Sequence, residues 1–505
     1  MPPRHAVCLA LACLTVILSG CAVPSRPSMS SKSVQAPEPT RFNELQIIGS
    51  HNSYKKAIDP DLLTNLALSS PEHAQALDYG HMSLREQLDM GLRNLELDVF
   101  HDPDGGRFAE PQGLRMIARP APYDADVMRV PGFKVMHVQD IDFRSHCPLL
   151  RDCLAQLNDW SQRNPDHVPL VITINAKDAA LDQPGFATPL EFDAAAWQAL
   201  DQALRRGLGP RLFEPDALRG EADSLPAAIA QGWPTLAQMR GKFLVVLDQD
   251  GEKRTSYTAG HPALRGRAMF VNAPAGTPES AVLIINDPVA RFDEISAAVE
   301  QGYLVRTRAD ADTLEARTGN YTRMRRAFAS GAQVVTTDYY APETRFGHNF
   351  RVRFPGGSYV RCNPVLRPDC ELKTGAASAL AGTEWRLVDF LSMDDAIGRI
   401  EPADDVLYTL HLHADGTVSM RLNCNRAQGS WQAEPSGSHD SGGILFGTLA
   451  STNAFCPPPN MDVRVTRDMN YVRSFVLRDG NLYLSLYADG GIYQFEPYAP
   501  DAVTA

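Results

Sequence analysis

The chain has 505 residues, of which 44% are hydrophobic and 21% are charged, and its formal net charge is −12. This length predicts roughly two to four units, each with its own core, and the composition is typical of a globular protein. The negative charge and the absence of any basic run argue against a nucleic-acid partner, because phosphate backbones require clustered Lys and Arg. The same balance disfavours purely electrostatic adhesion to anionic lipid.

Residues 1–20 have the pattern of an export signal. Arg4 precedes an apolar stretch over residues 6–18, which is too short to span a membrane and fits a signal peptide. The sequence Leu-Ser-Gly-Cys at 18–21 resembles the bacterial lipobox, which implies cleavage before Cys21 and lipidation of that cysteine. Ala22, in place of Asp, favours the outer membrane. We therefore expect a lipid-anchored protein of the cell envelope, with an ordinary signal peptide as the alternative.

Six cysteines remain after the signal and Cys21. An even number in an oxidising compartment predicts disulfides. A zinc site is the alternative, but the sequence contains no CxxC pair. Because the cysteines fall in three local clusters, we expect neighbours to pair: Cys147 with Cys153, Cys362 with Cys370, and Cys424 with Cys456.

A Ser- and Pro-rich segment over residues 21–41 has the composition of a flexible tether. Beyond it, short apolar runs alternate with helix-like segments, which predicts a parallel sheet covered by helices. The runs with strand character are 45–48, 95–100, 133–138, 170–174, 243–247, 268–271, 282–285, 303–305 and 333–335.

Nine such runs are one more than a closed (β/α)8 TIM-type barrel requires. We therefore expect either 268–271 or 282–285 to lie outside the barrel. A doubly wound open sheet is the alternative, but no Gly-rich phosphate loop opens a first helix. The predicted fold class is α/β, with the barrel and its closing segment over residues 42–371.

After a linker at 372–379, the pattern changes over residues 380–498. Strand-like runs are separated there by Gly, Asn, Asp and Pro turns, and Asp479-Gly480 is a hairpin signal. We expect a smaller, mostly antiparallel domain.

Polar side chains stand where the barrel runs end, and that edge of a barrel carries the active site. Histidines suit an acid and a base that work near neutral pH. Same-face carboxylates with a carboxamide suit Ca²⁺ or Mg²⁺, which neutralises charge on phosphoryl oxygens. The residues at these positions include His51, Asn52, Glu96, Asp98, His137, Asn175, Lys177, Arg306, Arg308 and Tyr339.

These positions also carry a family resemblance. The sequence is similar to the phosphatidylinositol-specific phospholipases C, above all to the Ca²⁺-dependent bacterial branch. The resemblance extends over about residues 42–371 and implies a barrel phosphodiesterase. The segments that carry it are 51–54, 92–98, 135–137, 302–310, 331–339 and 361–364.

The resemblance implies roles for individual residues. His51 is the expected general base and His137 the expected general acid. Where the family usually has Glu on the fourth strand this chain has Asn175, which removes one negative charge and is expected to weaken cation binding. The remaining expected cation ligands are Asn52, Glu96 and Asp98.

A second group of side chains is expected to contact the substrate: Lys177, Arg306, Arg308 and Tyr339. For the two arginines, ion pairs with Asp310 or Asp312 are the alternative. For Tyr339, packing at the barrel rim is the alternative.

The expected reaction is cleavage of a phosphodiester between a polyol and a glyceryl group. Attack by a neighbouring hydroxyl gives a cyclic phosphate, as in a phospholipase C. Attack by water corresponds to a glycerophosphodiester phosphodiesterase. A non-catalytic envelope binder is the third hypothesis, which Asn175 keeps open. The C-terminal domain resembles the META domain of bacterial envelope proteins at 380–385, 423–429 and 454–456, and its sequence does not identify a partner.

Overall fold

The computed structural model describes residues 39–354, 358–368, 370, 380, 382–404, 407–413, 416–435 and 441–498. Cys21, the signal segment and the predicted linker lie outside the described residues. Among the helices of the described part, none has the length and apolar character needed to cross a membrane.

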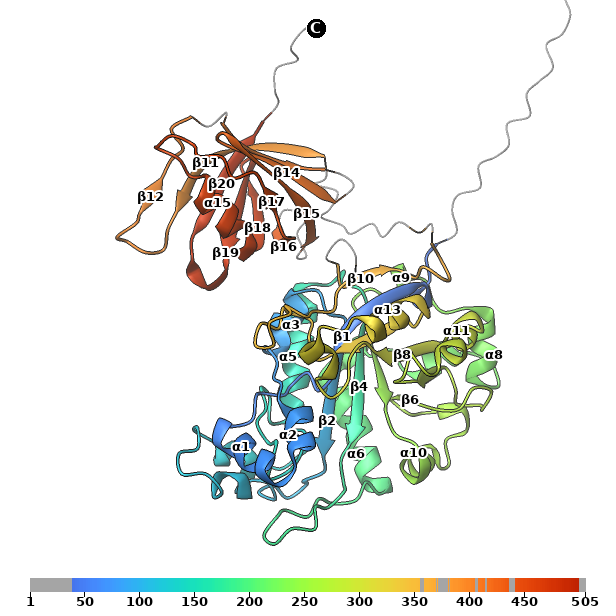
Figure 1. The fold of residues 1–505 in the computed structure, drawn as a ribbon. Helices are drawn as coiled ribbons and strands as arrows, with labels where there is room; N and C mark the ends of the chain where they lie inside the picture. Colours follow the sequence, from blue (N-terminus) through green and yellow to red (C-terminus); the bar gives the residue numbers. More distant parts are fainter. Residues whose placement is uncertain are drawn as a thin grey trace, which may run out of the picture. The chain divides into compact units, whose positions relative to one another are not determined.

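The first sheet is a nearly closed parallel barrel, as the sequence predicts (Figure 1). Its strand order is β6-β5-β4-β2-β1-β9-β8-β7, and a parallel bridge from Asn272 to Val282 joins the two ends. The strands are β1 (Leu45–Ser50), β2 (Asn94–Phe100), β4 (Leu170–Ala176), β5 (Phe243–Leu247), β6 (Phe270–Val271), β7 (Val282–Ile284), β8 (Leu304–Arg308) and β9 (Val334–Thr337).

The strand expected outside the barrel was misidentified. Runs 268–271 and 282–285 both supply barrel strands, and the run at 133–138 does not. Its strand β3 (Lys134–Val135) pairs antiparallel with the end of β2. The physical reason is the connection: a parallel neighbour needs a crossover, usually a helix that covers the sheet, and the chain between β2 and β3 forms only short helical turns.

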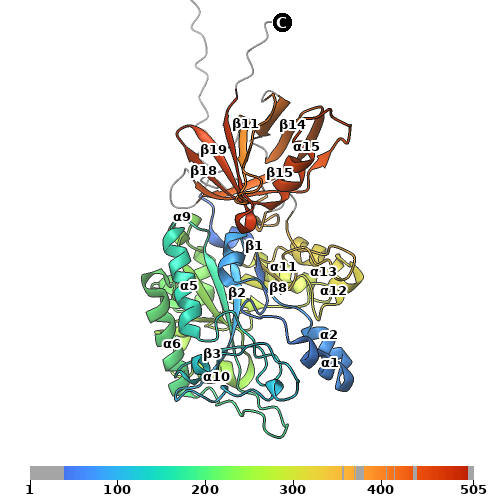
Figure 2. The ribbon, with the colours of Figure 1, turned by 90° about the vertical axis from the view of Figure 1, so that its left-hand side faces the viewer.

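Helices surround the barrel, and α5 and α6 pack against each other on one side of it (Figure 2). In α6, Asp193 accepts a hydrogen bond from the Ala196 N–H at the start, and Gly209 follows the end. The helices are α1 (Pro60–Ser69), α2 (Pro71–Leu77), α3 (Leu84–Asp89), α4 (Ala125–Arg129), α5 (Leu150–Arg163), α6 (Ala194–Leu208), α7 (Pro215–Arg219), α8 (Leu225–Gln231), α9 (Leu236–Met239), α10 (Gly251–Thr258), α11 (Phe292–Glu300), α12 (Leu314–Thr318) and α13 (Thr322–Ala329).

Strand β1 has different neighbours along its length. β2 joins it only at Gly49, opposite Asn94, and the antiparallel strand β10 (Val360–Cys362) pairs with its first half, Leu45–Ile47. A Cβ on Gly49 would lie 2.4 Å from the Cβ of Asn94, so this close approach requires glycine. The pairing of β10 with β1 joins the end of the barrel segment to its beginning.

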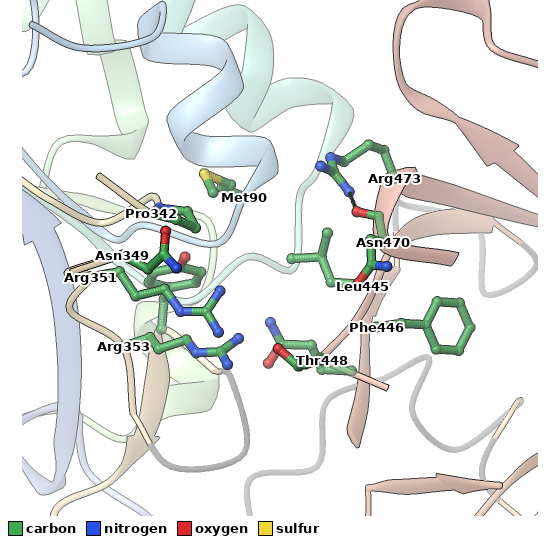
Figure 3. Close-up of a pocket in the computed structure, with 13 residues that line it drawn as sticks. Met90, Pro342, Asn349, Arg351, Arg353, Leu445, Phe446, Thr448, Asn470 and Arg473 are labelled. Carbon is green, nitrogen blue, oxygen red and sulfur yellow. Dashed lines mark hydrogen bonds between the residues drawn. The ribbon is translucent and has the colours of Figure 1, made fainter. Parts of the chain in front are cut away.

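The C-terminal sheet is antiparallel, in the order β12-β11-β13-β14-β15-β16-β18-β19-β20, and it closes because β11 also pairs with β20. In Figure 3, a dashed line joins the Arg473 side chain to the Asn470 carbonyl, which ties the start of β18 to the preceding turn. The elements are β11 (Thr383–Leu391), β12 (Arg399–Ile400), β13 (Tyr408–Leu412), β14 (Thr417–Leu422), β15 (Asn425–Pro435), β16 (Ser441–Phe446), β17 (Ala450–Ser451), α15 (Asp462–Asp468), β18 (Val472–Arg478), β19 (Asn481–Leu486) and β20 (Ile492–Pro497).

The three predicted disulfides are confirmed: Cys147–Cys153, Cys362–Cys370 and Cys424–Cys456. The first two belong to the barrel segment, and the third closes a separation of 32 residues in the C-terminal domain.

Candidate active site

A tight turn follows β1 and carries His51. Asn52 has a φ of 49°, a left-handed conformation that Asn adopts more readily than most residues. The Ser53 hydroxyl accepts a hydrogen bond from the Glu96 N–H (2.7 Å), and the Ser50 hydroxyl donates to Gln87 (2.6 Å). These bonds attach the turn to β2 and α3, so the direction of the His51 side chain is set by the barrel.

The His51 ring is oriented by a buried carboxylate. Its Nδ1 lies 2.9 Å from Asp338 Oδ1, and its Nε2 lies 3.8 Å from Glu96 Oε1. Because Asp338 is an acceptor, Nδ1 carries the proton and Nε2 keeps a lone pair. Burial and the positive charge of Arg308 lower the pKa of His51, although the negative charges of Asp338 and Glu96 act in the opposite direction. The side chain is 18% exposed, so a neutral base faces the solvent-accessible end of the barrel.

Asp338 also binds Arg308, whose Nη2 lies 3.1 Å from Oδ2. Burial alone would raise the pKa of Asp338, but His51 and Arg308 hold it well below its ordinary value. Burial and the charge of Asp338 raise the pKa of neighbouring Asp310 to about 7. Arg308 also donates to the Asp310 carbonyl (3.0 Å), so this arginine is engaged with the carboxylate that orients His51.

His137 has an equivalent support. It lies just after β3, on a hairpin closed by hydrogen bonds to Asp142, and its Nδ1 is 2.8 Å from Asp142 Oδ2. The same carboxylate oxygen is 3.3 Å from the buried Lys55 ammonium. The His137 side chain is 17% exposed. Sequence reasoning missed Asp142, because the hairpin that brings it back to His137 was interpreted as part of a barrel strand.

A short series of contacts connects the two histidines. The Tyr79 hydroxyl is 3.4 Å from His51 Nδ1, and the Lys55 ammonium lies 4.5 Å from the centroid of the Tyr79 ring. Lys55 then pairs with Asp142, which binds His137. Both rings therefore belong to one polar cluster at the carboxyl end of the barrel.

Glu96 and Asp98 lie two residues apart on β2, and each is paired with a cation. Glu96 Oε2 is 2.6 Å from the Arg306 guanidinium, and Asp98 Oδ2 is 3.2 Å from the Lys177 ammonium. Arg306 also binds Asn286 (2.9 Å) and is only 4% exposed. The charge of Asp98, which outweighs burial, raises the pKa of Lys177.

The two predicted carboxamide ligands already have hydrogen-bond partners. Asn175 is the register partner of Asp98 across β2 and β4, and its Oδ1 accepts a 2.6 Å hydrogen bond from Gln249. Asn52 donates to the Tyr79 hydroxyl (2.7 Å).

These residues do not form a calcium cage as they stand. Calcium takes six to eight oxygen ligands, and its affinity depends on their negative charge. Here Lys177 pairs with Asp98, and Arg306 is shared between Glu96 and a third carboxylate, Asp248, whose Oδ2 lies 3.5 Å from its Nη1. Within the described ranges, no group of three or more acidic, His or Cys side chains is arranged to hold a metal ion. The donor types suit calcium, but cationic side chains already engage both expected carboxylate ligands.

Tyr339 lies in the core, away from the exposed part of the site. It is 4% exposed and packs edge-to-face on Phe350, with ring centroids 5.9 Å apart. Burial raises the pKa of its hydroxyl well above the ordinary value. This position gives the side chain a packing role and leaves almost no surface for a substrate.

The barrel and the acid–base cluster at its carboxyl end define a phosphodiesterase of the phospholipase C type. A family model described as "Phosphoinositide phospholipase C, Ca2+-dependent" matches residues 40–364, and the META domain model matches residues 378–498. The chain belongs to the Ca²⁺-dependent phosphoinositide phospholipase C family. It is an enzyme of that type, and the family implies a phospholipid substrate.

No curated protein matches the chain. Among solved structures, a calcium-dependent phosphoinositol-specific phospholipase C from Pseudomonas sp. is 17% identical, with 64% of this chain and 96% of that chain covered and a TM-score of 0.39. A Ca²⁺-dependent phosphatidylinositol-specific phospholipase C from Streptomyces antibioticus is 18% identical, with 60% and 95% covered and a TM-score of 0.38. The phosphatidylinositol-specific phospholipase C from Listeria monocytogenes is 13% identical, with 62% and 94% covered and a TM-score of 0.36.

Proposed function

We propose that the enzyme cleaves the phosphodiester between a polyol head group and the glyceryl group of a phospholipid, with His51 as base and His137 as acid. One observation carries the proposal: each histidine is held through Nδ1 by a buried carboxylate, which leaves Nε2 for proton transfer. His51 takes the proton of the attacking hydroxyl as its oxygen bonds to phosphorus. His137 protonates the glyceryl oxygen as the P–O bond breaks.

The attacking group is proposed to be the neighbouring hydroxyl of an inositol-type head group, which gives a cyclic phosphate. Family membership favours this outcome, and phosphatidylinositol is the first substrate to test. Attack by water on a glycerophosphodiester remains the second candidate, because the same two histidines serve that reaction.

No step in this mechanism passes through a metal ion. When calcium binds in a phospholipase C site, it neutralises charge on the phosphoryl oxygens. The proposed donors in this chain are Asn52, Glu96, Asp98 and Asn175. For calcium to use the two carboxylates, Lys177 and Arg306 would first have to release them.

The test is turnover by two single variants. His51→Ala and His137→Ala are each expected to lower kcat by about 10²–10⁴-fold, and the two losses should not add because the pair acts as a unit. A substrate with a good leaving group needs no acid, so it should rescue His137→Ala but not His51→Ala. His261→Ala, whose ring binds a loop carbonyl, is the control.

Phosphorus NMR of the product separates the two candidate reactions. A cyclic phosphate supports attack by the neighbouring hydroxyl, and an open monoester supports attack by water. Wild-type turnover by both histidine variants on every phosphodiester that the enzyme cleaves would contradict the assignment.

We also propose that the protein is anchored to the cell envelope by lipid on Cys21, with the META domain as a binding or spacing module. Labelled fatty acid should appear on the mature chain and disappear in Cys21→Ser. An unlabelled wild-type protein would contradict the proposal.

A further inference from the structure

Lys177 occupies a distinctive position at the end of β4. It follows Asn175 by two residues, so both side chains leave the strand on the same face. Its backbone N–H donates to the Val99 carbonyl (2.8 Å), which ties the residue to β2. Its ammonium lies 3.2 Å from Asp98. A fixed positive charge therefore stands beside the carboxylate that was expected to bind a metal ion.

The two cationic side chains of the site differ in their contacts and in their exposure to solvent. Arg306 is 4% exposed, and its guanidinium binds Glu96, Asp248 and Asn286. Lys177 is 29% exposed, and Asp98 is its ion-pair partner in the described part of the chain. An ammonium has three N–H donors, so Lys177 retains donors for an anion while it stays paired. Arg306 is buried between Glu96 and Asp248, whereas Lys177 is accessible to a bound phosphate.

We infer that Lys177 supplies, from within the protein, the positive charge that a divalent cation would otherwise supply, and that this enzyme cleaves its phosphodiester without calcium. The inference rests on the proposed function. In the reaction, the Lys177 ammonium donates hydrogen bonds to a non-bridging phosphoryl oxygen and transfers no proton. The transferred protons remain those on His51 and His137, so the balance of the proposed reaction is unchanged.

The local charges support this assignment. Lys177 and Arg306 balance two of the three carboxylates Glu96, Asp98 and Asp248, so only one net negative charge remains for a divalent cation, and the neutral Asn175 adds none. A divalent cation would compete with the Lys177 ammonium for Asp98. A phosphate group, in contrast, is attracted by the ammonium. The same arrangement therefore disfavours a metal ion and favours the anionic substrate.

The first experiment compares wild-type turnover in EDTA and in excess calcium, together with calorimetric titration of the protein with calcium chloride. We expect equal turnover in the two conditions and no binding heat at this site. Turnover that EDTA abolishes and calcium restores would overturn the inference, and so would stoichiometric calcium binding that Asp98→Asn removes.

The second experiment changes the lysine. Lys177→Met should lower kcat by about 10²–10³-fold, the usual effect of removing one electrostatic donor, and Lys177→Arg should retain much of the rate. Lys253→Met is a matched control, because Lys253 is 30% exposed and pairs with Asp178 at 2.5 Å. Thermal melting verifies the fold of each variant. Wild-type kcat in Lys177→Met would overturn the inference.

A double variant provides the converse test. Asn175→Glu with Lys177→Met replaces a neutral and a positive side chain with a negative and a neutral one. This variant should bind calcium in calorimetry and recover turnover only when calcium is present. Failure to bind calcium would count against the claim that Lys177 and the neutral Asn175 exclude the metal ion.

The results also separate this inference from the proposed function. If the wild-type enzyme cleaves no phosphodiester with or without calcium, the proposed function fails, and calorimetry still decides whether the site excludes calcium. If cleavage occurs only with calcium, the proposed function stands and the role of Lys177 is wrong.

Discussion

The barrel and the META domain both bury charged groups, but they use them differently. At the carboxyl end of the barrel, buried carboxylates hold partly exposed groups: Asp338 binds His51, Asp142 binds His137, and Asp98 binds Lys177. In the META domain, buried Asp468 accepts hydrogen bonds from the buried Tyr493 hydroxyl (2.8 Å) and from the exposed Arg467 guanidinium (2.8 Å). The difference lies in the partner: two of the barrel carboxylates hold histidine rings, which exchange protons near neutral pH, whereas Asp468 holds a phenol and a guanidinium, which do not.

The sharpest test makes one isosteric change in each domain. Asp338 and Asp468 are both 5% exposed. Asp338→Asn should lower kcat/KM by about 10³–10⁴-fold, because an amide no longer enforces the Nδ1–H tautomer of His51. Asp468→Asn should leave turnover unchanged. Steady-state kinetics with melting curves measures both, and partial rescue by Asp338→Glu would identify Asp338 as a positioning residue. Equal kinetic losses in the two variants would remove the distinction.

Removal of a disulfide should lower the stability of the two domains by different amounts. The loop-entropy relation gives about 4 kcal/mol for Cys424–Cys456, which closes a 32-residue separation, and about 2 kcal/mol for Cys147–Cys153, with a separation of 6. Replacing Cys424 and Cys456 with Ser should destabilise the META domain while turnover persists. Denaturant unfolding followed by activity is the measurement. Loss of turnover before the META domain unfolds would contradict the separation.

The smallest expected effect is a pH dependence of barrel stability. Burial lowers the pKa of His167 to about 3, and its neutral ring is satisfied by Ser161 (2.8 Å) and the Val168 carbonyl (2.7 Å). The unfolded chain, with a pKa near 6.5, binds more protons between these values, so stability falls as pH falls through this window.

Between pH 6.5 and pH 5 the expected loss from His167 is about 2 kcal/mol. Urea unfolding at the two pH values measures it, and His167→Gln should make the barrel transition less dependent on pH. If the free energy of unfolding of His167→Gln changes with pH as much as that of the wild type, His167 does not account for the effect.

Much of the architecture could be predicted because it depends on local patterns. Alternating runs and helices indicate a parallel barrel, and turn residues indicate an antiparallel domain. The error concerned β3, whose pairing direction depends on the path of a long connection and not on the hydrophobicity of residues 133–138. Similarly, the disulfides were predictable because each cysteine lies near its partner in the sequence.

The site was predictable in its residue types but less so in its pairings. Strand ends placed His51, Glu96 and Asp98 at one edge of the barrel, whereas His137 lies on a hairpin after β3 that is not a barrel strand. Which cation faces which carboxylate depends on contacts between distant strands, such as Arg306 with Glu96, 210 residues apart. No local pattern contains that information, and the pairings alter the chemistry expected of the carboxylates.

The pairing of β10 with β1 has a consequence for how the barrel forms. Leu45 pairs with Cys362, which lies more than 300 residues later in the sequence. Strand β1 therefore gains its last neighbour only after nearly the whole barrel segment has been synthesised. Such contacts raise the contact order, which slows folding because loop closure must precede the stabilising interactions. In a nascent chain that ends after β9, the backbone edge of residues 45–47 with which β10 will pair is still unpaired. The barrel is therefore expected to fold cooperatively only after its complete segment is available, and until then that edge is a site for mispairing.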